Sequence, residues 1–116
     1  MPDNIKIIDN YVYIDTKNYT DDLLLLNDIK RTLADNNSIE LKGIFVDLRQ
    51  QFNICSSIVG KIAGFYKEKK VVVLLIDLNS HLDKMFSILG FKDLAKIFYD
   101  EEEYNNFIKE IINGNL

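Results

Sequence analysis

Residues 43–76 read GIFVDLRQQFNICSSIVGKIAGFYKEKKVVVLLI, and this stretch decides the fold. The run Val71 to Ile76 contains six consecutive apolar residues, which predicts a central strand buried on both faces. The shorter run at 44–46 predicts a second buried strand. Between the two, apolar residues at helical spacing predict a helix from Ser56 to about Lys69, with a buried face made of Ile58, Ile62, Phe65 and Tyr66. A strand, a helix and a second strand in this order predict parallel strands.

The segments on either side extend this pattern. Two short β-branched and aromatic runs flank the turn signal Asp9-Asn10, which predicts an opening hairpin. We expect the hairpin strands at 5–8 and 11–14, a helix over 21–34 capped by Thr20 or Asp21, a helix over 81–89 capped by Ser80, a strand over 95–99 and a helix over 101–113. Gly90 is the expected left-handed helix terminator.

The fold class predicted from these elements is α/β, in the order β-β-α-β-α-β-α-β-α. Residues 1–116 are expected to form a single domain, a mixed β-sheet packed by about four helices. The first helix should bury residues that recur at helical spacing, namely Leu23, Leu26, Ile29 and Leu33. The helix over 81–89 should bury Leu82, Met85, Phe86 and Leu89.

Composition narrows the classes of partner and compartment. The chain is 47% apolar and 28% charged, which is typical of a globular protein. The net charge is −4 and there is no basic run, so nucleic acid is not expected as a partner. A single cysteine fits a reducing compartment. No apolar run has the length of a membrane span, and the first residues lack a signal-peptide core, so the sequence predicts a cytoplasmic protein.

Two serines at the start of the helix that follows residue 55 are the main candidate functional residues. The first turn of a helix leaves N–H groups unpaired and carries a partial positive charge. Ser56 and Ser57 can therefore either cap the helix or carry a phosphate that the helix dipole stabilises.

Three segments together resemble the STAS domain of bacterial anti-sigma factor antagonists. The first is the strand ending Val46-Asp47-Leu48 with the later segment Ile54-Cys55-Ser56-Ser57-Ile58-Val59-Gly60. The other two are the helix that ends Ile88-Leu89-Gly90-Phe91 and the segment from Ile97 to Glu103. The resemblance places the family's phosphorylated serine at Ser56. It differs at Cys55, where the family has Asp, and at Ile58, where the family has Gly.

The resemblance implies a regulatory binding protein rather than an enzyme. It would bind a serine-kinase-type anti-sigma factor and would use no cofactor or metal. The implied partner-binding residues are Cys55, Ser56, Ser57, Ile58 and Val59, with Ile58 supplying apolar contact area. The implied docking surface also includes the loop from Gln50 to Cys55 and the loop after Asp77. The alternative is a STAS scaffold that is not phosphorylated and that joins a signalling assembly or forms a homo-oligomer.

Other single residues allow further interpretations. Cys55 and His81 could form a catalytic dyad, but no third polar residue can be assigned to them, and two such ligands do not complete a metal site. Asp47 and Asp77 end two buried strands, where α/β folds often contact ligands. Gly60 and Gly64 lie inside a helix rather than in a phosphate loop, so we expect them to allow close packing on a neighbouring element.

Overall fold

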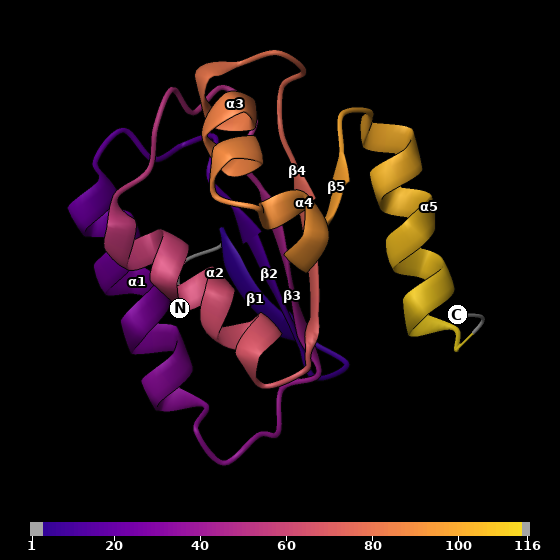
Figure 1. Cartoon of the computed structure of the whole chain (residues 1–116). Coiled ribbons are helices and arrows are strands. Elements are labelled where there is room, and N and C mark those ends of the chain that lie inside the picture. The colour runs from indigo at the N-terminus through magenta and orange to yellow at the C-terminus, as the bar shows by residue number, and fades with distance from the viewer. Residues whose placement is uncertain (1–3, 115–116) are drawn as a thin grey trace.

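Five strands form one mixed sheet at the centre of the computed structural model, which describes residues 4–114 (Figure 1). The strands are β1 (Ile5–Ile8), β2 (Tyr11–Asp15), β3 (Gly43–Asp47), β4 (Val71–Leu75) and β5 (Lys96–Phe98). The helices are α1 (Asp22–Asp35), α2 (Ser56–Lys67), α3 (His81–Ile88), α4 (Phe91–Leu94) and α5 (Glu101–Ile112). These bounds confirm the predicted mixed α/β fold and its element order, with one added helix, α4.

The strand order in the sheet is the same as the order in the sequence, β1-β2-β3-β4-β5. Strand β1 pairs antiparallel with β2, and the other three pairings are parallel. The turn between β1 and β2 is tight, with Asp9 and Asn10 both at positive φ, which is the geometry that two-residue hairpin turns require. The parallel strands all end at one edge of the sheet, so the loops after β2, β3 and β4 meet there.

Alternating side chains of β3 and β4 enter two separate apolar layers. Ile44, Val46 and Leu74 belong to the layer beneath α1, α2 and α3. Phe45 and Val73 belong to the layer beneath α5. Helices therefore cover both faces of the sheet, with α5 alone on its own side (Figure 1). Strands buried on both faces carry unbroken apolar runs, as residues 71–76 predicted.

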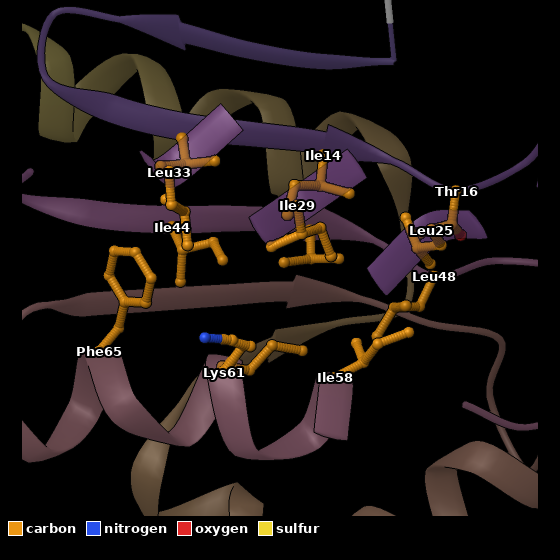
Figure 2. Close-up of a pocket in the computed structure, with 13 residues that line it drawn as sticks. Ile14, Thr16, Leu25, Ile29, Leu33, Ile44, Leu48, Ile58, Lys61 and Phe65 are labelled. Atoms are coloured by element: carbon orange, nitrogen blue, oxygen red, sulfur yellow. The ribbon is translucent and has the colours of Figure 1, made fainter. Parts of the chain in front are cut away.

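The space between α1, α2 and the sheet is filled by apolar side chains (Figure 2). Only about 10 Å³ of this space is free, which is too little for a ligand. The side chain of Lys61 lines this space although the residue is exposed. Its aliphatic part packs against the apolar layer while its ammonium group reaches solvent. The layer acts as core rather than as a binding pocket.

Three predicted helix boundaries are confirmed by their caps. Asp21 accepts a hydrogen bond from the Leu23 N–H at 2.8 Å, and Ser80 accepts one from the Asp83 N–H at 3.1 Å. Gly90 has φ 77°, the left-handed conformation expected after α3.

Some predicted core residues are exposed in the structure. Leu23, Tyr66 and Leu89 are 63%, 44% and 51% exposed, so their assignment to buried faces is wrong. In α1 the buried face includes Leu25 and Leu26, which shifts the face away from Leu23. Leu23 is the second residue of α1, Tyr66 is the last but one of α2, and Leu89 is the C-cap residue of α3.

The glycines of α2 do not pack against a neighbouring element. A Cβ atom added to Gly60 or Gly64 would meet no atom within 4 Å, so the prediction of close packing is wrong. In contrast, a Cβ on Gly43 would lie 2.6 Å from the Val71 carbonyl oxygen. Among residues 4–114, no helix is long and apolar enough to cross a membrane. The single-domain assignment of residues 1–116 stays a prediction.

Candidate partner-docking surface

The loops after β2, β3 and β4 are joined by hydrogen bonds at one edge of the sheet. Gln50 has φ 71° and donates its N–H to the Asp77 carboxylate at 2.7 Å. The Gln51 side chain donates to the carbonyl oxygens of Thr16 and Tyr19 at 2.8 and 3.2 Å. These bonds hold three loops, which are distant in the sequence, as one continuous surface.

Arg49 and Asp47 form the polar base of this surface. The Arg49 guanidinium donates to both Asp47 carboxylate oxygens, at 3.1 and 2.8 Å, and its other nitrogen lies 3.4 Å from Glu101. The hydrogen bond to Asp47 is the main reason that the pKa of Arg49 is raised above its usual value. A bidentate pair of this kind fixes the guanidinium plane, and with it the path of the chain leaving β3.

The loop between β3 and α2 carries an exposed aromatic ring. Phe52 is 76% exposed, and its ring stacks on the His81 imidazole at a centroid distance of 4.7 Å and an interplanar angle of 7°. Leu78, in the loop after β4, is 62% exposed. Phe52 and Leu78 are therefore candidates for partner contact, because the centre of a protein–protein interface is enriched in aromatic and apolar residues.

The start of α2 has no side-chain cap. Its N-cap residue is Cys55, whose carbonyl accepts the N–H groups of Ile58 and Val59 at 3.1 and 3.2 Å and whose side chain caps nothing. The other three helices of eight or more residues are capped by Asp21, Ser80 and Asp100. Neither Ser56 nor Ser57 is the capping residue, so the capping interpretation of the two serines is wrong.

The two serines are in the first turn of α2 and are exposed. Cys55 and Val59 are partly buried, and both pack against the core layer under the helices. Ile58 is only 1% exposed, so the prediction that it supplies surface contact area is wrong. Its β-branched side chain points into the core because position 58 is on the same face of α2 as Ile62.

Sequence reasoning missed the residues that shape this surface. Gln50, Gln51 and Phe52 were included only as members of a loop, and the contact between Phe52 and His81 joins two elements that the sequence does not connect. The one sequence signal for this surface is Phe52, because a large aromatic residue among polar neighbours in a loop indicates an exposed contact residue. Among the described residues, no group of three or more His, Cys, Asp or Glu is placed to hold a metal ion.

Comparison with known proteins relates the fold to a solved structure. No protein-family model matches the chain, and no curated protein matches it significantly. The crystal structure at 1.59 Å resolution of TM1081, a putative anti-sigma factor antagonist from Thermotoga maritima, matches with a TM-score of 0.61 and 19% sequence identity. The match covers 90% of this chain and 92% of TM1081.

The NMR structure of TM1081 gives the same result, with a TM-score of 0.61 and 18% identity over 90% of this chain and 86% of that one. At this level of identity the match concerns the path of the backbone and not the residues of the surface. The match and the observed strand order show that this chain has a STAS-like fold, the fold of an anti-sigma factor antagonist.

Proposed function

We propose that this protein is a cytoplasmic, non-enzymatic regulator that binds a serine-kinase-type anti-sigma factor and is released when Ser56 is phosphorylated. The observation that carries the proposal is the position of Ser56. It is exposed in the first turn of a helix without a side-chain cap, beside a braced loop that presents Phe52 to solvent. The fold shared with a putative anti-sigma factor antagonist supports the class of partner.

The apolar part of the proposed interface comes from the loops. Phe52 and Leu78 expose large side chains on segments that hydrogen bonds already hold in place. Because those segments are ordered before binding, a partner that covers them loses little conformational entropy. Ser57 and Val59 extend the contact along α2, and Cys55 joins the loop to the helix. Ile58 contributes by fixing α2 to the core.

A phosphate on Ser56 would change this surface strongly. It would add about −1.5 to −2 charges next to the exposed Phe52 loop. The unpaired N–H groups of the first turn and the helix dipole would stabilise the phosphate in the free protein. A partner that covers the same turn would have to remove water from that charge, so phosphorylation should favour the free state.

The test compares partner capture from the native host by the wild-type protein and by two variants. Ser56→Glu puts a negative charge at the proposed switch. Ser38→Glu puts the same charge on an exposed serine in the loop before β3, at the opposite edge of the sheet, and is the matched control. We expect an ATP-binding kinase to be captured by the wild type and by Ser38→Glu but not by Ser56→Glu, with a phosphate mapped to Ser56 by mass spectrometry.

The alternative is a STAS scaffold that assembles without phosphorylation. It is supported by Cys55, which places no charge beside the serine hydroxyl, where the family has an aspartate. If the wild type and both variants capture the same partners, and no phosphate is found on Ser56, the phosphorylation-switch hypothesis is wrong and the scaffold hypothesis is supported.

A further inference from the structure

Residues 77–80, which follow β4 and which we call the Leu78 loop, are fixed on both sides of the exposed Leu78 side chain. On one side, the Asp77 carboxylate accepts the Gln50 N–H at 2.7 Å. On the other side, the Asn79 N–H donates to the Asp83 carboxylate at 2.9 Å. Asn79 has φ 60°, a left-handed conformation that is uncommon for residues other than glycine, so the bond to Asp83 stabilises a backbone geometry that the loop alone does not favour.

Asp83 holds the Leu78 loop with only one of its two carboxylate oxygens. Its Oδ2 accepts the Asn79 N–H, while its Oδ1 accepts the Tyr99 hydroxyl at 2.9 Å and lies 3.6 Å from the Lys92 ammonium. Tyr99 directly follows β5, and Lys92 belongs to α4, which lies between α3 and β5 (Figure 1). The carboxylate therefore joins the Leu78 loop to two elements that contribute nothing to the proposed interface.

The orientation of the Asp83 carboxylate depends on the groups at its Oδ1. The Asp83 side chain is only 6% exposed, and a buried carboxylate is stable only where hydrogen bonds and cations compensate its charge. The terminal torsion of an aspartate is broad, so the torsion by itself does not fix which way the two oxygens point. The Tyr99 hydroxyl and the Lys92 ammonium fix it from one side, and this directs Oδ2 at the Asn79 N–H.

From this geometry we propose that Tyr99 and Lys92 are positioning residues for partner docking. They act through Asp83 on the Leu78 loop and keep Leu78 in the orientation that the partner covers, although neither is a proposed contact residue. The role of Leu78 in docking rests on the proposed function, whereas the hold on the loop can be measured in the free protein.

Amide hydrogen exchange of the free protein, followed by NMR, measures this hold. Asn79 is an exposed residue whose N–H donates to Asp83, so its exchange rate reports how often that bond opens. Tyr99→Phe keeps the ring and removes the hydroxyl, and we expect it to speed exchange at Asn79 about tenfold. Lys92→Met removes the ammonium and keeps an unbranched chain. It should speed exchange about threefold, because the Lys92 side chain is half exposed and its ion pair is weaker.

Two comparisons separate positioning from a general loss of stability. The N–H of Leu74, in the buried strand β4, exchanges through global unfolding, so Asn79 should remain much faster than Leu74 in every variant. The control Tyr66→Phe removes a hydroxyl from an exposed tyrosine in the last turn of α2 and should leave exchange at Asn79 unchanged. If Tyr99→Phe speeds exchange at Leu74 but not at Asn79, Tyr99 is a purely structural residue and the proposal is overturned.

The docking role is measured with the purified kinase that the wild-type protein captures. Tyr99→Phe should weaken its binding about fivefold, because the partner must then order the Leu78 loop on binding. Leu78→Ala removes the contact itself and should weaken binding at least as much, whereas Tyr66→Phe should bind like the wild type. Weaker binding by Leu78→Ala together with unchanged binding by Tyr99→Phe would overturn the positioning role. If Leu78→Ala and Ser56→Glu both bind like the wild type, the proposed docking surface itself is wrong.

Discussion

Gly43 and Gly60 show how the same residue type can have opposite roles. A Cβ on Gly43 would lie 2.6 Å from the Val71 carbonyl oxygen, inside the parallel pairing of β3 and β4, whereas a Cβ on Gly60 would meet nothing. We expect Gly43→Ala to lower the free energy of unfolding by about 1–3 kcal/mol because it overpacks the sheet. Gly60→Ala should raise it by about 0.5–1 kcal/mol because alanine favours the helix. Urea denaturation measures both, and equal effects would contradict the packing described for Gly43.

Asp83 is a buried acceptor whose removal should be costly. It is 4% exposed and accepts hydrogen bonds from the Asn79 N–H and the Tyr99 hydroxyl, both at 2.9 Å. Asp83→Ala would leave both donors unpaired, so we expect a loss of about 2–4 kcal/mol in the free energy of unfolding. The matched variant Asp93→Ala, at an exposed site, should change stability by less than about 0.5 kcal/mol. A loss under about 1 kcal/mol in Asp83→Ala would show that water replaces these bonds.

Tyr19 predicts a stability change at high pH. Burial, followed by the hydrogen bond that its hydroxyl donates to Asp28 at 2.7 Å, raises the pKa of Tyr19 to about 12. The unfolded chain has a tyrosine pKa of about 10, so this contribution to stability is complete below pH 10 and is lost between about pH 10 and 12. Tyr104 contributes in the same direction, so Tyr19→Phe should flatten the decline rather than remove it. Urea midpoints measured from pH 8 to 11.5 test this, and identical slopes in the two proteins would refute it.

At the level of single residues, the sequence predicted where the candidate docking surface lies in the fold but not the contacts that shape it. Ser56 and Ser57 stand in the exposed first turn, as the resemblance implied. Helical spacing assigned Ile58 to the buried face of α2, and this prediction is confirmed. Its second assignment, to the partner contact, came from its motif position and is wrong, because a motif position alone does not report which face of a helix a side chain occupies. The stacking of Phe52 on His81 and the bond from Gln50 to Asp77 depend on loop geometry, which no periodicity records.

The capping of the helices is the clearest property at the level of elements. Cys55 has the extended backbone typical of an N-cap, with φ −70° and ψ 156°, but its side chain makes no cap hydrogen bond. Serine has nearly the same size as cysteine and is a far better cap. We expect Cys55→Ser to raise the free energy of unfolding by about 0.5–1 kcal/mol, and Ser80→Ala, which removes an existing cap, to lower it by about 1 kcal/mol. Destabilisation by Cys55→Ser would instead show that packing of the sulfur against the core outweighs the new hydrogen bond.

Long elements could be predicted from the sequence because each has a strong period and a terminal signal. Helices α1, α3 and α5 begin one residue after a side-chain cap, and β4 follows from an unbroken apolar run. Helix α4 was missed because four residues span barely one turn, which is too short to establish a period. Its start at Gly90 was interpreted only as the end of α3, although the same left-handed residue both ends one helix and begins the next.

At the level of the whole molecule, the two apolar layers share the strands β3 and β4. Adjacent residues of β3 and β4 point into opposite layers. If these strands unfold, the apolar side chains of both layers therefore become exposed together. This sharing predicts one cooperative unfolding transition for residues 4–114, in which α5 does not detach before the helices on the other face.

Matched truncations in the two layers test this cooperativity. Ile62 is in the layer beneath α2 and Ile108 is in the layer beneath α5, and both are buried, at 2% and 8% exposure. Each change to alanine should lower the free energy of unfolding by about 2–4 kcal/mol. The chain has six tyrosines and no tryptophan, so tyrosine fluorescence reports tertiary packing while far-UV circular dichroism reports the helices. In both variants the two signals should change at one shared urea midpoint with an unchanged slope. If Ile108→Ala gave an early fluorescence transition with most of the helical signal intact, α5 and its layer would be a separate folding unit, and the shared strands would not couple the two faces.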